Sequence, residues 1–443
     1  MKRFLHFALA VLASASWPGL AAPSQVSAVP APITLDEAIS RARRANTAYA
    51  AALNTAGIAQ AQKGIAQAAI LPNVVYHNQF LYTQGQGVNA TAQTTTPVRF
   101  IANNSVHEYI SQGSVTQTIS GASITNYRKA NADAAVARAL LEVASRGLVV
   151  TAIANYYGVL ASQVKLSVAR RALSEAERFF TITQQRENGG EAAHADVVRA
   201  DLQVQQRQRD LNDAALALDK ARLDLGALLF ADPSTPYDLA SSLDQLPPLP
   251  VQSDVEAAAK ANNPDLKAAL EQVRSAGLEV AASRFAYLPD LVLNVSYGID
   301  APQFAKYGPD GVRNLGYSAS ATLDIPVWDW LATHERVRQS EFRRAQANVE
   351  LTVTQRRLLS SLRQFYEEAA VSQRQLTLLD KSVATATDTL RLVNMRYAAG
   401  EGTVLEIVDA QGSLVAAETN RTDGIVRYFT ALANLQTLTG KMP

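Results

Sequence analysis

The sequence contains no cysteine, which excludes disulfides, zinc–thiolate sites and thiol catalysis. It also lacks an imbalance of charge, because 41 Lys and Arg stand against 40 Asp and Glu, so no basic field points to a nucleic-acid partner. The five histidines show no paired metal-ligand spacing, and there is no glycine-rich phosphate loop. We therefore expect no catalytic residue, no cofactor and no specific metal site.

Beyond residue 20 the sequence has no apolar run long enough for a membrane-spanning helix. The N-terminus does carry Lys2 and Arg3, then a mostly apolar stretch from Phe4 to Trp17 and a small-x-small cleavage site ending at Ala21. This pattern is typical of a secretory signal peptide over residues 1–21. A membrane anchor is the alternative, but the apolar segment is too short for one.

Proline is missing from two long tracts, one between Pro97 and Pro233 and one between Pro326 and Pro443. Because proline costs about 3 kcal/mol inside a helix, both tracts are free to form long uninterrupted helices. Residues 231–253 between them contain five prolines and read as a linker. This linker divides the chain into residues 22–230 and 254–443.

Four segments of the first half return in the same order in the second half. The pairs are residues 45–53 with 262–270, the Leu-Pro steps at 71–72 and 288–289, residues 155–157 with 364–366, and residues 186–198 with 396–408. Four ordered matches indicate a tandem duplication of about 200 residues.

Each half also contains two segments with the alternation of a β-strand, followed by helical heptads. The expected strands span about 73–83, 106–119, 290–300 and 315–327. Apolar residues from Leu358 to Val393 step by alternating four and three, which is the seam of a coiled coil. Four strands of about ten residues can cross an outer membrane but cannot close a barrel, so we expect more than one copy of the chain.

Three segments resemble the TolC family of outer-membrane efflux proteins: AYLPDLVLNVSYG at 286–298, LDIPVWD at 323–329 and RYAAGEGTVLEIVDAQGSL at 396–414. The resemblance covers nearly the whole mature chain. It implies an α+β fold in which a homotrimer builds an outer-membrane β-barrel, four strands per protomer, continued by a long periplasmic α-helical coiled-coil barrel. It also implies outer-membrane lipid, a periplasmic adaptor and an inner-membrane transporter as partners.

The resemblance further implies a passive exit duct in the cell outer membrane of a Gram-negative-type bacterium, serving efflux or type I secretion. The segments 84–104 and 300–314 join the paired strands and are expected to face outward from the cell. A secreted coiled-coil scaffold or adhesion protein without channel activity remains the alternative, although it leaves the four strands unexplained.

The candidate functional residues lie where each half turns between its last two helices. Gly190 aligns with Gly400 at the turns, and Asp196 aligns with Glu406 just beyond them. In the family, acids at the positions of Glu406 and Asp409 form rings that constrict a closed periplasmic mouth and could bind cations. An ordinary solvated helix face with two acids is the alternative.

The family pattern also suggests how the mouth is held closed. Tyr397 and Asp196 match one locking pair of the family. The second lock requires an Arg two residues after the turn glycine, and here that residue is Gly402.

Overall fold

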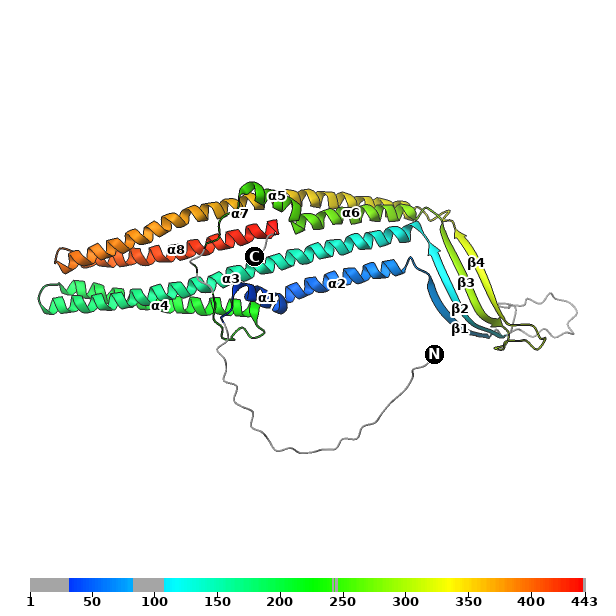
Figure 1. Ribbon diagram of the computed structural model, residues 1–443, viewed down its shortest axis with the longest axis horizontal. Helices are drawn as coiled ribbons and strands as arrows, with labels where there is room; N and C mark the ends of the chain where they lie inside the picture. The colour runs from blue at the N-terminus through cyan, green and yellow to red at the C-terminus, as the bar shows by residue number, and fades with distance from the viewer. Residues whose placement is uncertain (1–31, 83–106, 241–242, 244–245, 441–443) are drawn as a thin grey trace, which may run out of the picture.

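The computed structural model describes residues 32–82, 107–240, 243 and 246–440. Long helices run side by side over most of the length of the chain, and a four-stranded sheet lies at one end (Figure 1). In chain order the elements are α1 (Leu35–Ala45), α2 (Thr47–Ala68), β1 (Asn73–Tyr82), β2 (His107–Ile119), α3 (Gly121–Asn188), α4 (His194–Leu229), α5 (Gln252–Asn262), α6 (Pro264–Phe285), β3 (Asp290–Ala301), β4 (Leu315–Asp324), α7 (Ala332–Ala398) and α8 (Val404–Thr439). The order helix pair, strand pair, helix pair occurs twice, as the internal duplication requires.

Two asparagines that the repeat aligns occupy the same structural place in both halves. The Asn46 side chain accepts a hydrogen bond of 2.8 Å from the backbone N–H of Tyr49 at the start of α2. The Asn263 side chain accepts the same bond, also 2.8 Å, from Leu266 at the start of α6. Both asparagines are N-caps, which explains why the chain repeats this residue type there.

The two proline-free tracts form the longest helices, α3 with 68 residues and α7 with 67. At about 1.5 Å per residue each is roughly 100 Å long. Every member of the heptad stripe from Leu358 to Val393 is buried or half-buried, and most residues between them are exposed. Its buried members pack against α8, and the first of them also pack against α5, so the predicted seam is a real packing surface.

The largest buried cluster lies near the middle of the helical column, where α1, α3, α4 and α8 meet. Tyr156 and Tyr428 are fully buried there, and the rings of Tyr157 and Phe429 stack at 3.9 Å. The Tyr428 hydroxyl donates a 2.6 Å hydrogen bond to the carbonyl of Pro247. The proline-rich segment is therefore bound to the side of the column.

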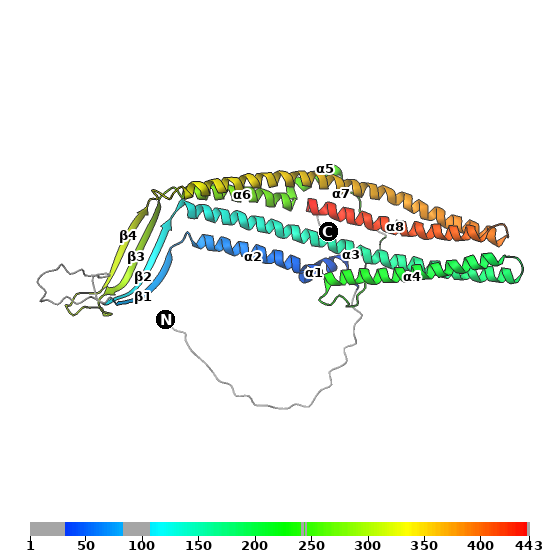
Figure 2. The same cartoon turned by 180° about the vertical axis from the view of Figure 1, so that it is seen from behind.

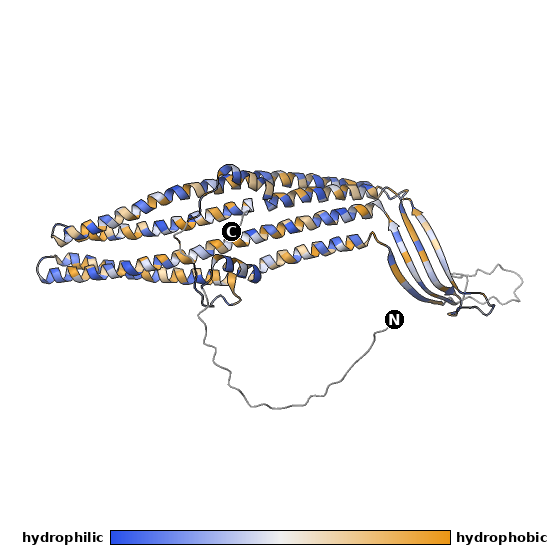
Figure 3. Cartoon of the chain, viewed as in Figure 1, coloured by the Kyte–Doolittle hydropathy of each residue, from blue (hydrophilic) through white to orange (hydrophobic). Residues whose placement is uncertain are grey.

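The strands form one antiparallel sheet in the order β1-β2-β3-β4. Its register places apolar side chains on one face, which we call the apolar face. It consists of Val74, Tyr76, Phe80, Tyr109, Val115, Leu293, Val295, Tyr297, Tyr317, Ala319 and Leu323, among others. The opposite, polar face carries Gln79, Gln112, Ser114, Asn294, Ser296, Ser318 and Ser320. Alternating colours along the strands in Figure 3 follow this division.

Asn78 belongs to the apolar face by register, yet its side chain is satisfied. It accepts a hydrogen bond of 2.8 Å from the Ser111 hydroxyl, which in turn lies 2.8 Å from the hydroxyl of Tyr76. This small network removes the conflict between a polar residue and an apolar surface.

β4 ends at Asp324, three residues before the expected limit at residue 327. The prediction overlooked Pro326, which has no backbone N–H to donate and therefore ends strand pairing. The segment 84–104, expected to face outward, lies outside the described residues.

Seen from behind, the sheet and the far helical turns again lie at opposite ends of the chain (Figure 2). Among the helices of the described residues, none has a stretch that is long and apolar enough to cross a membrane.

Candidate functional site

The two helical turns at the end opposite the sheet have the same construction. Gly190 and Gly400 adopt positive φ angles of 76° and 81°, a conformation that strains other residues. After each glycine the next N–H bonds back to an arginine carbonyl, Glu191 to Arg186 at 2.8 Å and Glu401 to Arg396 at 2.9 Å. These bonds satisfy carbonyls that the helix ends leave free.

Glu406 lies in the first turn of α8 and has two local partners. Its backbone N–H donates to the side chain of Thr403, the N-cap residue, at 3.3 Å. Its carboxylate pairs with Arg396, with an Nη1–Oε2 distance of 3.3 Å. Glu406 thus stabilises a helix N-terminus, and its charge is partly balanced within one chain.

Asp409 lies three residues further along α8 and is exposed. No ion pair among the described residues includes it. Positions three apart share one side of a helix, so Asp409 and Glu406 project in similar directions. Of the two acids, Asp409 carries the uncompensated charge.

Arg186, in the last turn of α3, binds the end of α7. Its guanidinium donates to the carbonyl of Tyr397 at 2.8 Å and to that of Ala398 at 3.2 Å. It also lies 4.4 Å from the centre of the Tyr397 ring. One positive side chain from the first half therefore caps the helix C-terminus of the second half.

Tyr397 is 8% exposed and contacts residues of α3. Its hydroxyl lies 3.4 Å from that of Thr183, and the ring of Phe179 meets its own edge-on at 5.3 Å. A hydrogen bond to Asp196 is absent from the bonds of the described residues in this single chain. Asp196 instead lines a cavity of about 610 Å³ that Tyr397 and Gly402 also line.

Gly402 approaches the end of α7 so closely that a side chain does not fit. A Cβ added there would lie 2.8 Å from the backbone nitrogen of Tyr397. A side chain here, including the arginine that the family resemblance implies, is thus incompatible with this backbone. Arg186 instead supplies a positive group next to Tyr397. The alignment of the two halves of the sequence did not identify Arg186 as a functional residue.

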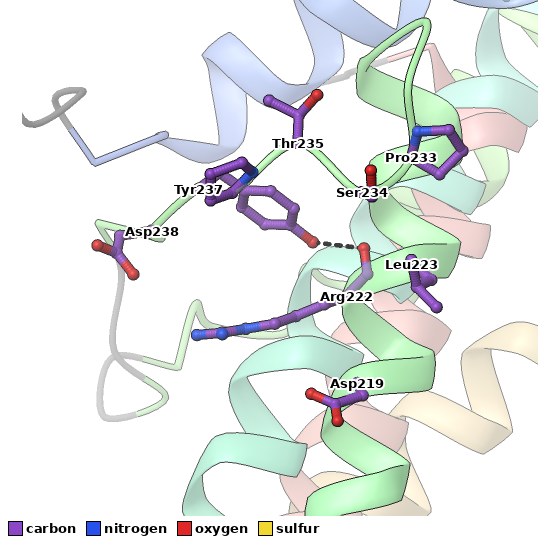
Figure 4. A pocket seen from close by; sticks show the side chains of 9 residues that line it. Asp219, Arg222, Leu223, Pro233, Ser234, Thr235, Tyr237 and Asp238 are labelled. Carbon is purple, nitrogen blue, oxygen red and sulfur yellow. Dashed lines mark hydrogen bonds between the residues drawn. The ribbon is translucent and has the colours of Figure 1, made fainter. Parts of the chain in front are cut away.

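A second cavity, of about 520 Å³, lies where the segment after α4 folds back on that helix (Figure 4). The Tyr237 hydroxyl donates a 2.8 Å hydrogen bond to the carbonyl of Arg222. Burial raises the pKa of Tyr237 to about 12. This arrangement fixes the linker to α4.

Among the described residues no group of three or more His, Cys, Asp and Glu is placed to hold a metal ion. The features that remain are the paired turns, the two acids on α8 and the Arg186 contact. Together they define a polar tip, by which we mean residues 186–199 and 396–409, at the end of the column furthest from the sheet.

Comparisons with known proteins agree with this architecture. The family model described as outer membrane efflux protein matches residues 257–441. The chain is 25% identical to the alkaline protease secretion protein AprF of Pseudomonas aeruginosa, covering 85% of this chain and 78% of that one. It is also 25% identical to the pyoverdine export outer membrane protein OpmQ of Pseudomonas putida, over 87% of this chain and 81% of the relative.

The fold matches that of a solved channel over most of its length. The CmeC outer membrane channel of Campylobacter jejuni superposes with a TM-score of 0.76 at 16% identity, covering 92% of this chain and 85% of that one. At this identity the likeness concerns the fold. It places the four-stranded sheet and the helical column in one known architecture.

Proposed function

We propose that this chain, which belongs to the outer membrane efflux protein family, is the passive exit duct of a tripartite efflux or type I secretion system. It is an outer-membrane protein that extends into the periplasm. The observation that carries the proposal is a sheet with one apolar and one polar face at the end of a column of long helices. Such a sheet suits a wall between lipid and a water-filled lumen.

The exposed apolar residues argue against a secreted scaffold or adhesion protein. Tyr317 is 82% exposed and Val74 is 72% exposed, and both lie on the apolar face. In a protein surrounded by water, an exposed apolar surface of this kind would promote aggregation. In lipid the same residues are in a favourable solvent.

The duct is proposed to be a homotrimer. Within one chain β1 and β4 are the edge strands, and each pairs on one side only. Open edges are not tolerated in lipid, so β4 of one copy is expected to pair with β1 of the next. Three copies would close a barrel of twelve strands, as the family resemblance implies.

The polar tip is proposed to be the periplasmic gate. Glu406 and Asp409 would form acidic rings around its mouth, with possible cation binding, and Gly190 and Gly400 would permit the tight turns. Because Arg396 offsets the charge of Glu406, we expect the ring of Asp409 carboxylates to attract cations more strongly than the ring of Glu406 carboxylates. Tyr397 is held by Arg186 in one chain, and its bond to Asp196 is proposed for the assembled trimer.

Opening is proposed to require a periplasmic adaptor and an inner-membrane transporter. The sequence has no phosphate-binding loop from which the chain could draw energy. The relatives AprF and OpmQ are named for alkaline protease secretion and for pyoverdine export, which are very different cargoes. We infer that the transporter selects the cargo and that this chain supplies the passage.

Two measurements on the purified protein test the proposal. Light scattering in detergent is expected to give the mass of three chains, and planar bilayers are expected to show stepwise currents. A stable barrel-containing monomer would rule out the shared barrel. Release of the protein into the medium, with no conductance after reconstitution, would instead favour the scaffold.

A further inference from the structure

Two carboxylates stand next to each other on the polar face, at the end of the sheet furthest from the helices. In the register of β2 and β3, Ile110 lies opposite Asp300, and Glu108 lies two residues before Ile110. Residues two apart in a strand share a face, so Glu108 and Asp300 are diagonal neighbours on the polar face.

Glu108 is deeply buried for a charged residue. It is 8% exposed, and its Oε2 atom is buried without a hydrogen-bond partner among the described residues. Leu81 lies opposite it on β1, and Ile110 follows it on the same face. A buried carboxylate beside a second one is costly unless a positive species neutralises the pair.

No side chain of the described residues supplies that positive charge. None of their ion pairs includes Glu108 or Asp300. The polar face of β1 offers Gln79 and the more distant His77, and that of β4 offers Gly316 and Ser318. In the segment between β3 and β4, the Lys306 ammonium lies over the ring of Tyr307, at 5.6 Å from its centre.

We propose that Glu108 and Asp300 form a divalent-cation site in the wall of the lumen, one in each chain, near the end that opens outside the cell. Hard divalent cations prefer oxygen ligands, and Mg²⁺ is commonly held by one or two carboxylates with water completing its shell. A double positive charge matches two carboxylates, and the lumen supplies the water. The orphaned Oε2 atom of Glu108 is then a metal ligand.

A second pair of acids on the same face provides a control inside the protein. Asp290 and Asp324 lie directly opposite each other in β3 and β4, at the end of the sheet next to the helices. Asp324 is exposed, as Asp300 is, but Asp290 is only half-buried whereas Glu108 is 8% exposed, so water screens the charges of the control pair more strongly. This pair is expected to bind divalent cations much more weakly.

The experiment measures Mn²⁺ binding to the detergent-solubilised full chain by the loss of the free-ion EPR signal. Asp409→Asn/Glu406→Gln protein is the background, so that acids of the polar tip do not contribute. We expect one class of binding site, with one Mn²⁺ ion bound per chain. The isosteric Glu108→Gln/Asp300→Asn change should raise the half-saturation concentration by about tenfold or more.

Asp324→Asn is the matched control and should leave this class of sites unchanged. Elution as an intact oligomer shows that each variant is folded. Equal Mn²⁺ binding with and without Glu108→Gln/Asp300→Asn would overturn the proposal. The absence of bound Mn²⁺ in the background protein would also overturn it, because a proton would then neutralise the pair. The readout needs no open channel, so its failure would leave the exit-duct function intact.

Discussion

At the scale of single residues, the polar tip depends on one arginine that contacts two helix ends. Arg186 is joined to its own turn through its backbone carbonyl and to the end of α7 through its guanidinium. Gly402 leaves no room for a side chain that could do the same from the second half. At the tip itself, Arg186 and the Tyr397 ring beneath it join the two hairpins, and the Gln203–Gln411 hydrogen bond joins them further along the column.

We expect Arg186→Ala to favour an open tip. Loss of two charged hydrogen bonds and the ring contact should cost about 2 kcal/mol, or roughly a thirtyfold shift toward opening. Single-channel recording in planar bilayers measures the open fraction. Arg199→Ala is the control, because Arg199 lines the same cavity without a hydrogen bond or ion pair among the described residues. Equal open fractions in both variants would mean that Arg186 has only a local role.

The two acids of α8 should differ in their effect on ion selectivity. Like charges about 6–8 Å apart repel by roughly 1–2 kcal/mol per pair at an intermediate dielectric, so rings of acids attract cations. Because Arg396 offsets Glu406, we expect Asp409→Asn to reduce cation selectivity more than Glu406→Gln. Reversal potentials in asymmetric salt report the change. Unaltered selectivity and divalent block in Glu406→Ala/Asp409→Ala channels would identify the acids as a solvated helix face.

At the scale of elements, the register of the strands decides which side chains lie on the apolar face of the sheet and which lie on the polar face. Because side chains alternate along a strand, a shift by one residue would exchange the two faces completely. The pairing of Val115 with Val295 and of Val295 with Ala319 keeps one apolar surface across three strands. The neighbouring Ser114, Ser296 and Ser320 continue the polar surface on the other side.

Two adjacent residues in the middle of β4 test which face meets lipid. Ala319 belongs to the apolar face and Ser320 to the polar face. Ala319→Lys should cost about 2–4 kcal/mol per chain in the membrane and reduce the yield of assembled channel. Ser320→Lys should assemble normally and reduce cation selectivity. Quantifying heat-modifiable oligomer in outer-membrane fractions distinguishes them, and a larger assembly defect in Ser320→Lys would reverse our assignment of the faces.

At the scale of the whole molecule, the chain is polarised along its length. The sheet and the segment 302–314 lie at one end, and both helical turns lie at the other (Figures 1 and 2). With the sheet in the outer membrane and the helices in the periplasm, the segment 302–314 is left on the outer side of the cell.

The absence of native cysteine makes this orientation simple to measure. Lys306→Cys should react with a membrane-impermeant maleimide on intact cells, since Lys306 is exposed in the segment between β3 and β4. Leu405→Cys, which is exposed at the opposite end, should react only after the outer membrane is permeabilised. The reverse labelling pattern would contradict the proposed orientation.

The sequence by itself determined the elements that depend on local rules. Proline-free tracts and a heptad stripe sufficed for the long helices, because helix continuity and seam packing are written in residue spacing. Strand positions followed from alternation, and the turn glycines from their repeated setting. The family motifs then connected these elements to one architecture.

Only the tertiary structure decided which distant side chains meet. Nothing in the spacing of the sequence links Arg186 to Tyr397, or Glu108 to Asp300, because each pair joins different halves of the duplicated chain. Those contacts depend on how α3 packs beside α7 and on the register of β2 with β3. The lack of space at Gly402 is likewise a property of the folded backbone. Local periodicity specifies elements, whereas charge pairing and steric exclusion arise only when the elements pack together.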